Sequence, residues 1–150
     1  MKDGTDSKTM EVFGFFNEVG IINQLSSAIL AKCLPDGVHP SHFSIVNHLV
    51  RMGDGKAPVR IAAAMQVTKN TMTHSLKVLE DKGFITVEPD PADGRGKLVR
   101  LTDAGRTFRE TAIQSVMARF EDMIEPAHRD AMKRVMSDLI LLRKHLDENR

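Results

Sequence analysis

Residues 68–83 read TKNTMTHSLKVLEDKG, and their spacing predicts one amphipathic helix. Its apolar positions recur at i, i+4 and i+7, and they are Met72, Leu76 and Leu79. Such a stripe must pack against other apolar residues. Thr68 is a favourable N-cap residue, and Gly83 lies where a glycine commonly ends a helix. The sequence therefore predicts both ends of this helix.

The opposite face of the helix carries short polar side chains and one base. These residues are Asn70, Thr73, His74 and Lys77. This face carries no acidic residue until Asp81, so the first two turns could approach a polyanion closely. The alternative interpretation is a capped helix with a solvated polar face.

The segments on either side of this helix predict a helix-turn-helix followed by a wing. Residues 59–65 form a short alanine-rich helical pattern that is separated from the next helix by a turn. Residues 84–88 (FITVE) and 97–101 (KLVRL) alternate as strands do, and the intervening PDPADGRG is rich in turn formers. A β-hairpin with Arg95 at its tip completes a winged helix.

Long apolar helical patterns flank the winged helix. Residues 9–34 repeat apolar side chains every three or four positions, and residues 40–52 form a second helix. Thr102 caps a helix that we expect to end at Glu125, before Pro126 begins the last helix. The expected fold class is mainly α with a small β-hairpin. The surplus of apolar residues in the long helices indicates contact with a partner chain.

The composition limits the class of protein. The 150 residues are 41% hydrophobic, and the formal net charge is +1. The positive excess lies in residues 56–100, so one copy would bind phosphates weakly and two copies would bind them usefully. No apolar run approaches the roughly 20 residues of a membrane span, and the N-terminus is too polar for a secretory signal. We therefore expect a soluble cytoplasmic protein that does not contact a membrane.

The segments VTKNTMTHSLKVLEDKGFI and DGRGKLVRLTDAG resemble the MarR family of bacterial transcription regulators, and the resemblance extends over residues 10–146. It implies a winged helix-turn-helix DNA-binding domain at residues 41–101 and dimerisation helices at residues 1–40 and 102–150. It also implies a homodimer on a pseudo-palindromic operator in double-stranded DNA. Such regulators usually repress, and many are released by a small-molecule effector.

The expected DNA contacts combine the start of the recognition helix with the wing and nearby lysines. Asn70 and His74 can bond base edges, and Thr73 can offer a methyl or a hydroxyl group. We expect Arg95 to extend into a minor groove, while Asp93 holds the loop by bonding backbone amides or Arg95. The full set is Lys56, Thr68, Lys69, Asn70, Thr71, Thr73, His74, Lys77, Arg95 and Lys97.

Four residues are candidates for lining an effector pocket, although aromatic residues of this kind are also typical of a core. They are Phe13, Phe16, His42 and Phe43. Cys33, His39 and His42 lie near one helix junction, but Cys-x5-His-x2-His is a weak zinc spacing. We expect no metal and no cofactor, with hydrogen-bonded or exposed histidines and Cys33 as a buried apolar residue.

The sequence lacks a glycine-rich phosphate loop, G-x-S-x-G and H-E-x-x-H, so we do not expect an enzyme. The leading hypothesis is a dimeric, ligand-responsive DNA-binding repressor. The alternative is a winged-helix protein-interaction module that does not bind DNA directly.

Overall fold

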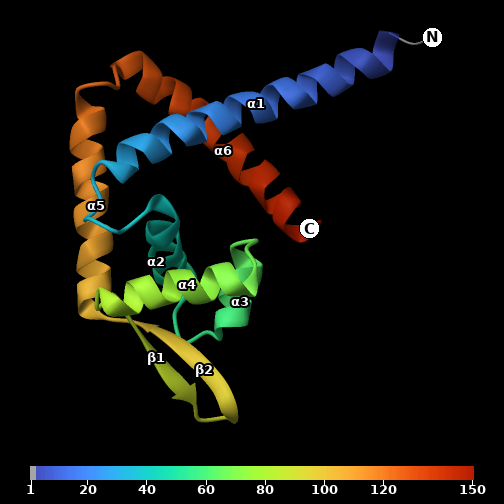
Figure 1. Cartoon of the computed structure of the whole chain (residues 1–150). Helices are drawn as coiled ribbons and strands as arrows, with labels where there is room; N and C mark the ends of the chain where they lie inside the picture. The colour runs from blue at the N-terminus through green and yellow to red at the C-terminus, as the bar shows by residue number, and fades with distance from the viewer. Residues whose placement is uncertain (1–2) are drawn as a thin grey trace. The chain divides into compact units, whose positions relative to one another are not determined.

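The computed structural model describes residues 3–150, a mostly helical chain with one two-stranded antiparallel sheet (Figure 1). Its elements are α1 (Asp3–Ala31), α2 (Pro40–Met52), α3 (Pro58–Ala64), α4 (Lys69–Asp81), β1 (Ile85–Asp90), β2 (Asp93–Leu101), α5 (Asp103–Glu121) and α6 (Pro126–Glu148). This order confirms the predicted fold class. The chain divides into two compact units, Met1–Ser115 and Val116–Arg150.

Residues 1 and 2 of the expected segment 1–40 lie outside the described residues. Within residues 3–150, no helix is both long enough and apolar enough to cross a membrane.

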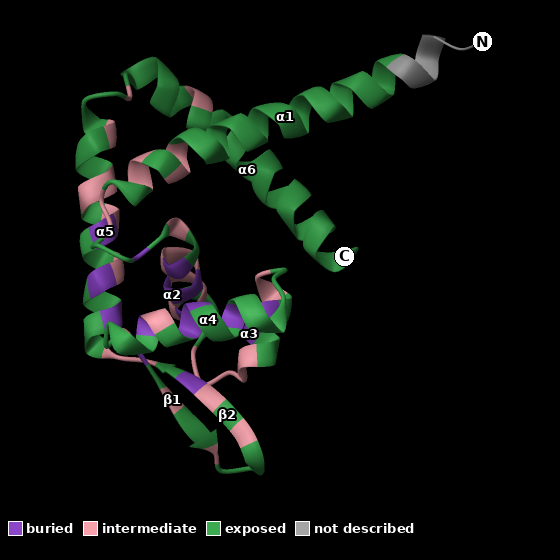
Figure 2. Ribbon diagram, in the orientation of Figure 1, coloured by how far each residue is buried: buried purple, intermediate pink, exposed green. Residues whose placement is uncertain are grey.

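The core of the first unit lies where α2, α3 and α4 meet the base of the hairpin, and Figure 2 shows buried residues on these elements. Leu49, Ile61, Leu79 and Val99 come from α2, α3, α4 and β2, and each is at most 1% exposed. Burying a side chain of this kind stabilises a fold by about 1.5–3 kcal/mol. Gln66 adopts a positive φ of 55° in the turn between α3 and α4. These contacts hold α3 and α4 as a helix-turn-helix.

Both predicted ends of α4 are confirmed. The Thr68 hydroxyl accepts a hydrogen bond from the Thr71 N–H at 3.2 Å. At the other end, the Phe84 N–H, just beyond the helix, donates to the Leu79 carbonyl in its last turn over 2.9 Å. Gly83 makes this closure possible because its φ is +75°, where a side chain would be strained.

The end of α4 is also joined to the start of α5. The Thr102 hydroxyl accepts from the Gly105 N–H at 3.0 Å and donates to the Gly83 carbonyl at 2.6 Å. A Cβ atom at Gly105 would overlap the Phe84 carbonyl oxygen, so glycine is needed for this close approach. Thr102 therefore caps α5, as predicted, and anchors the base of the wing to α4.

Several boundaries differ from the prediction. α1 covers Asp3–Ala31 instead of residues 9–34, and it ends early because Leu34 precedes Pro35, which disfavours helical backbone. α5 ends at Glu121, before the predicted Glu125. Glu125 precedes Pro126, has an extended ψ of 163° and is the N-cap of α6, so the earlier helix must end before it.

Candidate nucleic-acid interface

A groove lies between the start of α3, the outward face of α4 and the wing. Its volume is about 690 Å³, and we call it the wing groove. It is lined by Ala57, Pro58, Val59, Lys69, Thr73, Leu76, Lys77, Glu80, Val87, Asp93, Arg95, Gly96 and Lys97. The structure thus brings together five predicted DNA contacts from two separate elements. Four of those five are cationic, and they face two carboxylates, so the groove is positive in balance.

The first turns of α4 present the remaining predicted contacts of the recognition helix. Thr68, Asn70, Thr71 and His74 are exposed, and none of them lines the wing groove. The Thr68 and Thr71 hydroxyl oxygens lie 2.9 Å apart, so each already has one partner. Asn70 and His74 project from the exposed face near the N-terminus of the helix, which is the part that enters a major groove in helix-turn-helix proteins.

Two groove residues of α4 have partners on their own helix. The Thr73 hydroxyl donates to the Lys69 carbonyl at 2.9 Å, which leaves its methyl group and its oxygen lone pairs for a ligand. The Lys77 ammonium donates to the Asp81 carboxylate, and this hydrogen bond raises the pKa of Lys77. Because the pair is exposed, the ammonium can exchange this carboxylate for a phosphate at little cost.

The predicted position of Arg95 at the hairpin tip is wrong. The tip is formed by Pro91 and Ala92, and Arg95 lies within β2. The proline and glycines that predicted a loop are tolerated because both strands of a two-stranded sheet are edge strands. Residues 94–96 bulge, since no β1 residue opposes them in the register of the described hairpin.

The bulge aims Arg95 into the wing groove. The Asp93 carboxylate accepts a hydrogen bond from the Arg95 N–H at 3.2 Å, which confirms the prediction that Asp93 bonds backbone amides. A Cβ atom at Gly96 would lie only 3.1 Å from the Asp90 Cβ, so the bulge is tightly closed there. Arg95 remains exposed and can extend away from the strand.

This arrangement of recognition helix and wing agrees with the comparisons with known proteins. Residues 36–96 match the family model for the MarR family. The winged helix of this chain is thus a MarR-family domain. Over 148 residues the chain is 27% identical to the HTH-type transcriptional regulator PecS of Dickeya dadantii (strain 3937), with 97% of this chain and 87% of PecS covered.

Two solved structures share the fold of this chain. A mutant of MarR from E. coli, complexed with operator DNA, is 21% identical with a TM-score of 0.63, and the match covers 86% of this chain and 95% of that one. BpsR of Bordetella bronchiseptica, whose DNA binding is regulated by 6-hydroxynicotinic acid, is 22% identical with a TM-score of 0.63, and the match covers 84% and 98%. The match over residues 36–96 confirms the predicted family for the winged helix, and it is a family of transcription regulators with a winged-helix DNA-binding fold.

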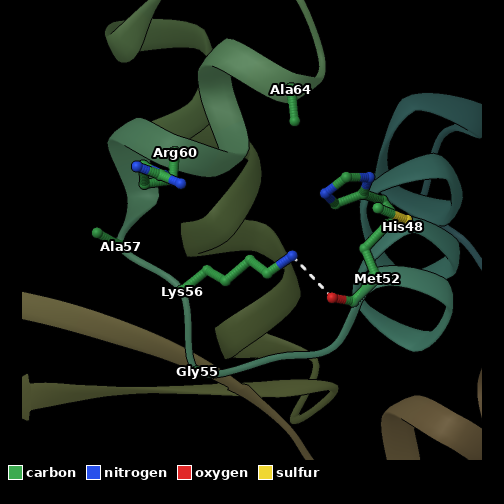
Figure 3. Close-up of a pocket in the computed structure, with 7 residues that line it drawn as sticks. All are labelled: His48, Met52, Gly55, Lys56, Ala57, Arg60 and Ala64. Atoms are coloured by element: carbon green, nitrogen blue, oxygen red, sulfur yellow. Dashed lines mark hydrogen bonds between the residues drawn. The ribbon is translucent and has the colours of Figure 1, made fainter.

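Lys56 lies apart from the other predicted DNA contacts. Its ammonium donates to the Met52 carbonyl at 2.8 Å, and its side chain lines a second cavity of about 450 Å³ beside His48 and Arg60 (Figure 3). It does not line the wing groove. Sequence alone grouped it with Lys69, Lys77 and Lys97 as a candidate phosphate contact.

The four predicted effector residues are divided between two environments. Phe13 and Phe16 are 63% and 45% exposed on α1. His42 is buried at the start of α2, and Phe43 is half-buried with its ring centroid 6.3 Å from that of Phe108. None of the four lines the wing groove or the cavity that contains Lys56. Their role as an effector pocket stays a prediction.

A third cavity, of about 630 Å³, was not predicted. It is lined by Lys32, Cys33, Leu34, Pro35, Phe84, Ala104, Thr107, Phe108, Thr111 and Ala112. Phe84 and Phe108 stack in parallel there, with centroids 4.3 Å apart. The sequence signals were Leu34 and Phe84, which are apolar residues beside turns, but only the fold brings the segment that follows α1 to α5. Cys33 is half-buried at this cavity and is not a fully buried core residue.

The two histidines near the start of α2 are linked by a structural hydrogen bond. The His42 Nδ1 atom accepts from the His39 N–H at 3.0 Å, so it bonds the N-terminal backbone of α2. Burial lowers the pKa of His42, and the neighbouring His39 and His74 lower it further. Among the described residues, no group of three or more His, Cys, Asp or Glu side chains is arranged to hold a metal ion.

Proposed function

We propose that this chain is a homodimeric DNA-binding repressor of the MarR family that recognises a pseudo-palindromic operator and is released by a small ligand. The single observation that carries the proposal is the wing groove, in which Lys69, Lys77, Arg95 and Lys97 converge from α4 and β2. Cations from two elements that face one groove suit a backbone that carries a phosphate at every nucleotide. The operator complex of E. coli MarR, which shares this fold, supports a duplex as the ligand.

The proposed roles follow from position. Asn70 and His74, on the exposed N-terminal turns of α4, read base edges in the major groove, and Thr73 contacts a thymine methyl or a phosphate. Arg95 enters the adjacent minor groove. Thr68, Lys69, Thr71, Lys77 and Lys97 contact the backbone.

Exposed apolar faces support a homodimer. Phe13, Ile22 and Leu25 of α1 are each more than 60% exposed, and α6 has no residue that is buried within its own chain. Its exposed apolar residues are Met132, Val135, Met136, Leu139, Ile140, Leu141, Leu142 and Leu146. Surfaces of this extent are unfavourable in water and mark an interface. We therefore assign residues 1–40 and 102–150 to dimerisation and residues 41–101 to DNA binding.

A small-ligand effector is proposed by analogy with BpsR, which has the same fold and is regulated by an aromatic acid. Phe13, Phe16, His42 and Phe43 remain the candidate pocket residues. In a dimer the exposed rings of α1 would gain neighbours that one chain does not supply.

Selection of bound sequences from random duplexes tests the function. A dimer on a pseudo-palindrome selects two inverted half-sites whose centres lie about one helical turn apart. Affinity for mixed genomic fragments should also fall steeply with salt because bound phosphates release counterions. No retention of DNA at low salt would favour the alternative, a winged-helix protein-interaction module.

A further inference from the structure

The cavity that contains Lys56 is cationic and separate from the wing groove. It has a volume of about 450 Å³ and lies between the end of α2, the following loop and one side of α3 (Figure 3). Its lining consists of His48, Met52, Gly55, Lys56, Ala57, Arg60 and Ala64. Three of these residues carry basic side chains, none is acidic, and the rest provide a small apolar wall.

The charges in this cavity are not neutralised by nearby carboxylates. Among the described contacts, the only hydrogen-bond partner of the Lys56 ammonium is neutral. It is the Met52 carbonyl oxygen, at 2.8 Å. Within the described part of the chain, neither Lys56 nor Arg60 forms one of the salt bridges. Asp54, the nearest acidic residue in the sequence, accepts a hydrogen bond from the Leu101 N–H at 2.7 Å.

The lysine can bind a ligand without leaving its present partner. An ammonium group has three N–H donors, and one of them satisfies the carbonyl at the C-terminal end of α2. Arg60 adds a planar guanidinium that can bind a carboxylate through two parallel hydrogen bonds. The loop that holds Lys56 is itself fixed, because the Gly55 N–H donates to the Val99 carbonyl at 2.7 Å and the Val99 N–H donates to the Lys56 carbonyl at 2.9 Å.

We propose that this cavity binds a small organic anion, a carboxylate with an apolar body, through Lys56, Arg60 and His48. The carboxylate meets the two permanent cations, and the apolar body covers Met52, Ala57 and Ala64. His48 adds a third positive charge once it is protonated. A DNA phosphate also presents anionic oxygen atoms that could bind these cations, so the test must distinguish a free carboxylate from a DNA phosphate.

The pKa of His48 should report whether the cavity is occupied. Burial lowers its pKa, and the positive charges of Lys56 and Arg51 lower it further. Arg51 lies on its own helix, Lys56 on the adjoining loop, and Arg60 lines the same cavity from α3. The negative charge of a bound carboxylate should raise the pKa of His48, because it offsets these three positive charges.

Calorimetric titration of the full chain with benzoate tests the proposal, with benzamide as the neutral ligand of the same shape. We expect saturable binding of benzoate only, roughly tenfold weaker binding in Lys56→Gln and in Arg60→Gln, and unchanged binding in Arg106→Gln. In an NMR titration, benzoate should move the His48 midpoint to higher pH. Equal binding of benzoate and benzamide, or parental affinity in both cavity variants, would overturn the proposal.

The second arm uses a duplex of mixed sequence in the absence of benzoate. If the anion is a free carboxylate, Lys56→Gln leaves duplex affinity unchanged, whereas Lys97→Gln in the wing groove lowers it. If Lys56→Gln lowers duplex affinity and the parent does not bind benzoate, the occupant is a DNA phosphate and the proposed site is wrong. Benzoate binding is measured without DNA, so failure of the repressor function would not alter its outcome.

Discussion

The winged helix and the terminal helices differ in how far they bury their apolar residues. The winged helix buries its own, and Ile61, Leu79 and Val99 are fully enclosed by neighbouring elements. α6 leaves Met136 52% exposed and Leu141 67% exposed. The difference teaches that one chain supplies a complete core for the first region but leaves the apolar face of the second exposed. Four predictions test this contrast.

The largest effect is expected in the core of the winged helix. Leu79→Ala removes a side chain with 0% exposure and leaves a cavity, so the free energy of unfolding should fall by about 2–5 kcal/mol. Urea denaturation followed by circular dichroism measures this change. Val59→Ala, at a position that is 61% exposed, is the control and should stay close to the parent. Equal losses in the two variants would show that the described core is wrong.

The second-largest effect is expected on self-association, from a substitution in α6 that leaves the winged helix folded. Met136→Glu places a charge on the exposed apolar face of α6, so it should weaken self-association by roughly tenfold or more while the winged helix stays folded. Sedimentation equilibrium measures the association. Ser137→Glu is the control, because it adds the same charge at the neighbouring polar position. Association that survives in Met136→Glu would remove this face from the proposed dimer interface.

A smaller effect is expected on duplex affinity, from a substitution that changes the packing of neither region. Arg95→Ala should weaken duplex binding by roughly five- to tenfold with little change in stability, because an exposed cation is lost from the wing groove. Arg100→Ala is the matched control, since Arg100 lies on the same strand, pairs with Glu88 and does not line the groove. Identical affinities for Arg95→Ala and the parent at a fixed salt concentration would exclude the wing assignment.

The smallest effect concerns pH. The pKa of His42 in the folded chain lies below its ordinary value of 6.5, mainly because the ring is buried. The unfolded chain therefore takes up a proton first as pH falls below about 6.5, and the winged helix should lose stability from there down to the folded pKa. Denaturation at a series of pH values checks the trend, and His42→Gln should flatten it. Stability that rises as pH falls through this range would contradict the prediction.

Local chemistry made much of the winged helix predictable. Thr68 and Gly83 mark the ends of α4 through a side-chain cap and a positive φ, which depend on only a few neighbouring residues. The alternation in residues 84–88 and 97–101 likewise predicted the hairpin. Arg95 was misplaced because a bulge depends on pairing with another strand, and glycine and proline alone do not distinguish a bulge from a turn.

The sequence by itself determined the order of the elements, the caps of α4 and the stripe of Met72, Leu76 and Leu79, because these features arise from spacing and backbone preference along one segment. Only the tertiary structure decided which cations share a cavity. It placed Lys69 and Arg95 in the wing groove and Lys56 beside His48 and Arg60. The physical reason is that such groupings depend on how separate elements pack, and packing joins residues whose distance along the chain carries no information about their distance in space.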